Sequence, residues 1–165
     1  MNEIAELFRR LTHGVYVVGV ANHERRDAFT AAWVMQAAFE PLSLVLSINR
    51  ENASYPIMTA SGAFTVNVVK QGQLELARRF GTQSGRERDK LAGVRWKPGH
   101  GGAPILDDAL AYFECELTGS VTAGDHDVVI GRVVNGRILD PNATPMSYAE
   151  TGDMDGSSAL YPARF

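Results

Sequence analysis

The fold is decided by the stretch Phe29-Thr30-Ala31-Ala32-Trp33-Val34-Met35-Gln36-Ala37-Ala38-Phe39, which is followed, after Glu40-Pro41, by Leu42-Ser43-Leu44-Val45-Leu46-Ser47-Ile48-Asn49. The first run is typical of a strand, yet a hydroxyl and two methyl groups stand at Thr30–Ala32, where a strand normally carries bulk. The second run is apolar on both faces, which is typical of a central strand. The pair therefore predicts two consecutive strands, of which the first carries a patch of small residues.

Segments with strand character also dominate the rest of the chain. We expect strands over 15–20, 64–69, 111–122 and 128–139, the last two forming a hairpin, and an edge strand near 160–161. Helices are expected over 2–11, 54–62, 73–81 and about 87–91, with a loop over 97–104. Because strand–helix–strand alternation is not sustained, a doubly wound parallel sheet is disfavoured. The order of elements favours a mainly β fold, a closed or nearly closed antiparallel barrel with a few peripheral helices.

Composition and charge exclude several classes of protein. The 165 residues fit one compact domain that spans the whole chain, with 45% apolar and 21% charged residues. A net charge of −3 provides no general attraction to nucleic acids or anionic membranes. Every apolar stretch is shorter than the roughly 20 residues of a membrane-spanning helix. Residues 1–6 are acidic and lack the pattern of a secretion signal, so we expect a cytoplasmic protein.

Cysteine and histidine usage argues against thiol and metal chemistry. Cys115 is the single cysteine, so no internal disulfide can form, and its neighbours Glu114 and Glu116 disfavour the thiolate. The four histidines are dispersed, with no pair at helical spacing, so we expect no metal site. The glycine-rich segment 99–102 follows no strand, and Pro104 stands where a nucleotide-binding helix should begin.

A candidate anion site follows the second strand. Arg50 can hold a phosphate through two parallel hydrogen bonds, and Ser54 is placed to cap the helix that comes next. The alternative is a solvated arginine beside an ordinary helix cap. The small residues at Thr30–Ala32 allow either a flat ring or another strand to approach the backbone. Together the two features predict a flat ligand with an anionic tail, and flavin mononucleotide (FMN) has that shape.

Two further features also have competing explanations. His126, beside Asp125 at the tip of the expected hairpin, either lies in a solvated turn or reaches over a pocket. Over a pocket, it would donate a hydrogen bond or a proton near neutral pH. The pair Arg78-Arg79 either makes a second phosphate contact or forms the solvated face of its helix.

Six segments occur in an order that resembles one known family. They are Gly14-Val15-Tyr16-Val17-Val18, Phe29-Thr30-Ala31-Ala32-Trp33-Val34, Pro41-Leu42-Ser43-Leu44-Val45, Ser61-Gly62-Ala63-Phe64-Thr65-Val66-Asn67-Val68, Leu76-Ala77-Arg78-Arg79-Phe80 and Gly124-Asp125-His126-Asp127-Val128-Val129-Ile130-Gly131. From about Phe8 to about Leu139 the chain resembles the flavin reductase-like family. This FMN-binding group has an antiparallel split β-barrel and includes the reductase components of two-component monooxygenases and flavoredoxin-like proteins.

The resemblance implies a site and an assembly. The isoalloxazine ring of the flavin would lie along Thr30, Ala31, Ala32, Trp33 and Val34, and the ribityl and phosphate groups would meet Ser47, Ile48, Asn49, Arg50, Asn52 and Ser54, with Arg79 and Phe80 adjoining. His126 matches the catalytic position on the nicotinamide side of the ring. The family forms homodimers with the flavin near the subunit interface, so a homodimer is expected.

The resulting hypothesis is an NAD(P)H-dependent flavin reductase that passes a hydride from NADH or NADPH to FMN or FAD, with a monooxygenase as a partner for the reduced flavin. The alternative is a flavoredoxin-like, FMN-binding electron-transfer protein that takes its electrons from a protein partner. A third hypothesis is a barrel that binds haem or another small aromatic ligand. No motif that reads the ribose or its 2′-phosphate is identifiable, so the sequence does not distinguish NADH from NADPH.

Overall fold

The computed structural model describes residues 2–165, which form one sheet of seven antiparallel strands and a separate two-stranded sheet. In spatial order the large sheet consists of β2 (Arg26–Ala31), β1 (Tyr16–Ala21), β5 (Ala63–Val68), β8 (Ala111–Ala123), β9 (His126–Ile138), β4 (Leu42–Asn49) and β3 (Val34–Phe39). The small sheet pairs β6 (Trp96–Pro98) with β7 (Pro104–Leu106). The helices are α1 (Glu3–Phe8), α2 (Ser54–Ser61) and α3 (Leu74–Gly81), with short 3-10 helices η1 (His100–Gly102), η2 (Tyr148–Thr151) and η3 (Ser157–Leu160).

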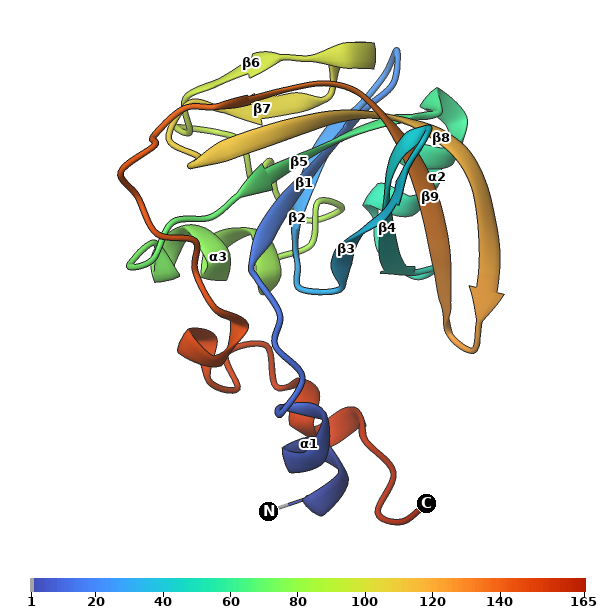
Figure 1. Cartoon of the computed structure of the whole chain (residues 1–165), viewed down its shortest axis with the longest axis vertical. Coiled ribbons are helices and arrows are strands. Elements are labelled where there is room, and N and C mark those ends of the chain that lie inside the picture. Colours follow the sequence, from blue (N-terminus) through green and yellow to red (C-terminus); the bar gives the residue numbers. More distant parts are fainter. Residues whose placement is uncertain (1) are drawn as a thin grey trace.

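The large sheet is strongly curved but does not close. Its end strands β2 and β3 are consecutive in the chain, joined by Ala32-Trp33, and they do not pair with each other. Figure 1 shows the long hairpin of β8 and β9 arching along one side of the molecule. The prediction of a mainly β, antiparallel fold with peripheral helices is confirmed, and the barrel is open between β2 and β3.

Two hydrophobic clusters occupy the two faces of the sheet. Val18, Leu46 and Phe64 pack with Met58 of α2 in the first cluster. The second cluster contains Val17 and Phe80, the latter from α3, together with residues of β7 and of the C-terminal segment. Adjacent residues on β1 fall in different clusters because successive strand side chains point to opposite faces. β1 is therefore buried on both sides, and α2 and α3 cover opposite faces of it.

The C-terminal segment returns to the start of the chain. Asn2 donates side-chain hydrogen bonds to the carbonyl oxygens of Tyr161 (3.2 Å) and Pro162 (3.1 Å), and the rings of Phe8 and Tyr161 lie 5.5 Å apart. Arg9 forms an ion pair with Asp153 at 3.5 Å. As a result, α1 and the segment that contains η3 lie together at one end of the molecule (Figure 1).

Several expected elements differ from the structure. The strand over 42–49 has the expected bounds, but the first helix is shorter than 2–11. Residues 87–91 form turns and irregular backbone instead of a helix, and 97–104 contain the end of β6, all of η1 and the start of β7. Residue 160 ends η3 and residue 161 follows it, so neither forms a strand. The small sheet forms because the buried side chain of Asn67 binds its backbone, accepting from Leu106 N (2.8 Å) and donating to Pro104 O (3.2 Å). This contact joins residues about 40 positions apart, which local patterns do not reveal.

Residues 2–165 also bear on thiol chemistry, metal binding and membrane crossing. Cys115 is fully buried, and burial, reinforced by the Glu114 carboxylate, raises the pKa of its thiol to about 12. Among residues 2–165, no group of three or more histidine, cysteine or acidic side chains is arranged to hold a metal ion. In the same part of the chain, every helix is too short or too polar to cross a bilayer.

Gly131 is a tightly packed point of the sheet's interior. It lies on β9 between β4 and β8, and a Cβ atom added there would be 2.5 Å from Cζ of Phe64 and 3.1 Å from Cβ of Cys115. Phe64 is itself fully buried and has no room to move away. We expect Gly131→Ala to lower the free energy of unfolding by about 1–3 kcal/mol, the usual cost of overpacking. Urea unfolding would measure this loss of stability.

The matched control is Gly119→Ala on the neighbouring strand β8, where the nearest atom to an added Cβ is 3.9 Å away. This variant should change stability much less. Equal losses for the two variants would show that Phe64 does not limit the packing at Gly131.

Candidate functional site

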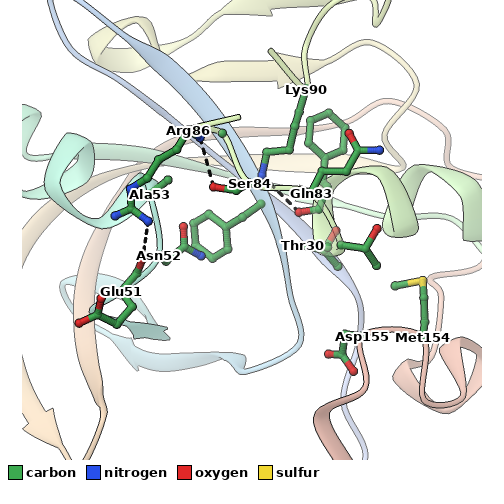
Figure 2. Close-up of a pocket in the computed structure, with 15 residues that line it drawn as sticks. Thr30, Glu51, Asn52, Ala53, Gln83, Ser84, Arg86, Lys90, Met154 and Asp155 are labelled. Carbon is green, nitrogen blue, oxygen red and sulfur yellow. Dashed lines mark hydrogen bonds between the residues drawn. The ribbon is translucent and has the colours of Figure 1, made fainter. Parts of the chain in front are cut away.

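A cavity of about 470 Å³ opens beside the end strand β2. Figure 2 shows its walls, which come from three segments distant in sequence: residues 51–53, residues 80–86 and residues 154–155. The full lining consists of Phe29, Thr30, Glu51, Asn52, Ala53, Phe80, Gly81, Thr82, Gln83, Ser84, Gly85, Arg86, Lys90, Met154 and Asp155. The volume lies within the roughly 300–1,000 Å³ typical of sites for cofactors and other small molecules.

One wall of the cavity is formed by β2. Because β2 is at the end of the sheet, one edge of its backbone pairs with no other strand among residues 2–165, and N–H and C=O groups at that edge can bind a ligand. The Thr30 hydroxyl donates to Ala77 O at 2.7 Å and so fastens α3 to this strand. Gly81 permits the close approach, since an added Cβ would lie 3.2 Å from Cβ of Thr30. The small side chains therefore allow both a helix and a ligand to approach β2.

Two cations, Arg86 and Lys90, also line the cavity. Arg86 donates from NH1 to Glu51 O at 3.0 Å and so links two of the loops that form the walls (Figure 2). A guanidinium has five N–H donors, so most of its donors remain for a ligand. Lys90 is only 4% exposed and donates to Phe80 O at 3.4 Å. Burial lowers the pKa of Lys90, an effect that the nearby Asp27 carboxylate opposes.

A buried acidic residue, Asp27, is the ion-pair partner of Lys90. Asp27 Oδ1 lies 3.6 Å from Lys90 Nζ, and Asp27 Oδ2 accepts a hydrogen bond of 2.8 Å from the hydroxyl of Ser54. Gly85 passes directly over this carboxylate, because an added Cβ would lie 2.3 Å from Asp27 Oδ2. The loop that forms the cavity wall is thus held against β2 by an ion pair and by a position that accepts only glycine.

The structure brings together part of the site that the sequence predicted. Thr30, Asn52 and Phe80 line the cavity. Ala31 and Ala32 follow Thr30 along the chain, and Val34 lines a second, smaller cavity of about 210 Å³. Ser47, Ile48 and Asn49 form the end of β4, where the side chain of Ile48 is buried in the core.

Ser54 and Arg79 make hydrogen bonds within the protein. Ser54 is the first residue of α2, but the N-cap position is Ala53, which makes no side-chain cap, so the prediction of a Ser54 cap is wrong. The Ser54 hydroxyl is fully buried against Asp27. Arg79 donates from Nε to Lys90 O at 2.7 Å and from NH2 to Ala92 O, and it thereby shapes the loop that carries Lys90.

Arg50 lies at the turn between β8 and β9, outside the lining of the 470 Å³ cavity. Its guanidinium donates to Asp127 Oδ1 at 3.0 Å and to Gly124 O at 2.6 Å. His126 in this turn is not simply solvated. Its Nδ1 lies 2.8 Å from Asp125 Oδ1, and its ring is tilted against that of Trp33, with 5.0 Å between the centroids.

Sequence reasoning missed most of the loop after α3. The residues concerned are Thr82, Gln83, Ser84, Gly85, Arg86 and Lys90, together with Glu51, Ala53, Met154 and Asp155. A usable signal was present in 81–86, where two glycines bracket small polar residues and an arginine follows. Such a sequence favours a loop whose backbone can approach a ligand closely.

Comparison with known proteins places this geometry in a family. A family model described as a flavin reductase like domain matches residues 8–157. The chain therefore belongs to the flavin reductase-like family, as its six sequence segments indicated.

Individual relatives and structures agree with this family. A high molecular weight rubredoxin of Moorella thermoacetica is 36% identical over 141 residues, covering 84% of this chain and 61% of the relative, so the chain spans less than two thirds of that protein. The NADH:FAD oxidoreductase SgcE6 of Streptomyces globisporus, solved in complex with NAD and FAD fragments, superposes with a TM-score of 0.82 at 25% identity, covering 90% of this chain and 88% of that one. An FMN-binding protein of Thermus thermophilus has a TM-score of 0.73 at 32% identity, covering 78% and 73%.

Proposed function

We propose that this protein is a flavin reductase that uses a reduced nicotinamide, NADH or NADPH, as the electron donor and FMN or FAD as the acceptor. The observation that carries the proposal is the cavity itself, which is lined by the end strand β2 and by the two cations Arg86 and Lys90. Family membership and the structural similarity to an NADH:FAD oxidoreductase support it. A monooxygenase that consumes the reduced flavin is the partner in this proposal.

The residues present fit a flavin. A phosphate suits the end with Arg86 and Lys90, because charge-assisted hydrogen bonds favour an anion in a partly buried site. The ring would then extend along β2 from Thr30 through Ala31 and Ala32 toward Trp33 and Val34. We assign the phosphate to Arg86 and Lys90 instead of Arg50, because the guanidinium of Arg50 is already bonded to the β8–β9 turn.

The protein's contribution to the reaction is orientation and polarisation. A bound flavin supplies the redox chemistry, accepting a hydride from the nicotinamide. Backbone N–H groups at the unpaired edge of β2 would stabilise negative charge that develops on the pyrimidine part of the ring. His126 would orient the nicotinamide through Nε2, because Nδ1 is engaged by Asp125. Holding the two rings together lowers the entropic part of the barrier.

The direct test is anaerobic reduction of flavin by the purified protein. FMN, FAD and riboflavin are each mixed with NADH or NADPH, and the loss of flavin absorbance is followed. We expect catalytic bleaching with at least one pair. No bleaching with any pair would contradict the proposal. The relative named as a rubredoxin favours electron transfer as a second candidate function. A protein that keeps its flavin through desalting, yet reacts with neither nicotinamide, would establish that alternative.

The phosphate assignment is tested with three arginine variants. Arg86→Ala should weaken FMN binding about ten- to a hundredfold, and riboflavin binding little, because a charge-assisted contact contributes roughly 1.5–3 kcal/mol. Arg88→Ala is the matched control, since it removes the same charge from the same loop outside the cavity lining. Arg50→Ala should leave the ratio of the two affinities unchanged. If Arg50→Ala alone discriminates between the flavins, the phosphate lies at the end of β4, as the sequence suggested.

We further infer that a second copy of the chain covers the face near β3. Four of the six residues of this end strand are exposed. Phe39 (86% exposed) and Met35 (65%) lie near Leu42 and Phe113, beside the 210 Å³ cavity. Exposed apolar groups of this size gather at protein interfaces more often than on free surfaces. A homodimer would bury these apolar side chains, in agreement with the homodimer expected from the family resemblance.

Sedimentation of the purified protein tests the dimer. We expect a dimer for the unmodified chain and dissociation for Phe39→Asp. Leu160→Asp is the control, because Leu160 is about as exposed (84%) but lies on η3, away from the face near β3. A monomeric unmodified protein, or equal effects of the two variants, would exclude this interface.

A further inference from the structure

Arg50 binds nearly every acceptor of the β8–β9 turn. Its NH2 donates to Gly124 O (2.6 Å), and its NH1 donates to His126 O (3.2 Å) and to the carboxylate of Asp127 (3.0 Å). Its backbone N–H donates to Asp125 O at 3.4 Å. All four residues from Gly124 to Asp127 are therefore held by a single arginine that follows β4.

Asp127 is the second part of this arrangement, and we call Arg50, Tyr55 and Asp127 together the clamp. It is only 6% exposed, and its other carboxylate oxygen accepts a hydrogen bond from the hydroxyl of Tyr55 on α2. The hydrogen bonds from Tyr55 and Arg50 lower the pKa of Asp127 below its usual range, so the carboxylate is ionised at neutral pH. A buried, ionised carboxylate with two donors fixes their positions strongly. The clamp thus ties the turn to both β4 and α2.

The clamp determines where the ring of His126 lies. His126 is the first residue of β9 and pairs in register with Asn49, the last residue of β4. The turn before it is open to solvent, with the Asp125 side chain 83% exposed, and such a hairpin end frays without tertiary contacts. With the clamp in place, the ring rests against Trp33, at the end of the small-residue patch.

We propose that Arg50, Tyr55 and Asp127 are positioning residues that hold His126 against Trp33 for the nicotinamide step. The inference rests on the proposed function, and it gives Arg50 a role in turnover instead of flavin binding. None of the three side chains lines the 470 Å³ cavity, so their effect on the reaction passes through His126. Loss of the clamp changes how the nicotinamide is oriented and leaves the flavin contacts intact.

The contact between His126 and Trp33 provides a readout that does not require turnover. Protonated imidazole quenches indole fluorescence, so a pH titration of Trp33 emission reports the approach of His126. Trp96→Phe removes the other tryptophan and serves as the background. Asp125 and Trp33 contact the His126 ring, and the charged guanidinium of Arg50 binds the carbonyl oxygen of the same residue. We expect a titration in this background that His126→Ala abolishes.

The clamp variants are Asp127→Asn and Tyr55→Phe, and the latter leaves the Arg50–Asp127 pair in place and is the milder change. Both should remove most of the His126-dependent fluorescence change. In steady-state kinetics they should raise the nicotinamide KM or lower kcat about tenfold, as does His126→Ala, with flavin affinity nearly constant. Tyr148→Phe is the matched control, because it removes a hydroxyl bonded to Ser157, far from the turn. Thermal unfolding confirms that each variant is folded.

The outcomes separate this inference from the proposed function. If the protein reduces flavin while Asp127→Asn and Tyr55→Phe retain both the Trp33 titration and the nicotinamide kinetics, the clamp does not position His126. If the variants lose the titration and turnover but also lose flavin affinity, the clamp supports the whole site and the specific role is overturned. If the unmodified protein oxidises no nicotinamide, the proposed function fails. In that case, loss of the Trp33 titration in Asp127→Asn and Tyr55→Phe would still show that the clamp holds His126 against Trp33.

Discussion

The connection of β2 to β3 is the constraint on which the rest of the structure depends. In a flat sheet of seven strands the two end strands would lie roughly 29 Å apart. The two residues Ala32-Trp33 span at most about 11 Å between the flanking Cα atoms. The sheet must therefore curl until its ends nearly meet. A barrel with one open seam follows, and the small residues that precede the connection lie at this seam, where β2 has an unpaired edge.

The buried pair of Lys90 and Asp27 is the second requirement of the site. Two charges removed from water are costly unless each retains good partners, and here Ser54 and the carbonyl of Phe80 complete the set. The pair fastens the loop after α3 to β2. The same loop supplies Arg86. It therefore forms part of the cavity wall and also provides the positive charge of the cavity.

Local patterns predicted the longer strands and some residues of the cavity lining, but neither the two-stranded sheet nor the partners of the polar side chains. The run 42–49 was readable because apolar residues continue without a break, and Thr30 was readable because small residues are unusual there. Arg50 looked like a phosphate ligand because its partners, in the turn more than 70 positions away, leave no mark near it in the sequence. Lys90 was not among the predicted site residues, for the same reason. The carboxylate that pairs with Lys90 belongs to Asp27, which lies 63 residues earlier on a different element. The long strands of the large sheet are thus readable from local patterns, whereas the charge of the cavity depends on tertiary contacts.

The meeting of α1 with the C-terminal segment also bears on how such a domain is combined with others. Both ends of the chain emerge at the same pole, away from the β8–β9 hairpin and the face near β3 (Figure 1). Chain termini that lie close together on a surface tolerate fusion well. A neighbouring module attached at either end would start from the same place. Another module can therefore be joined at either end without starting from the β8–β9 hairpin or the face near β3.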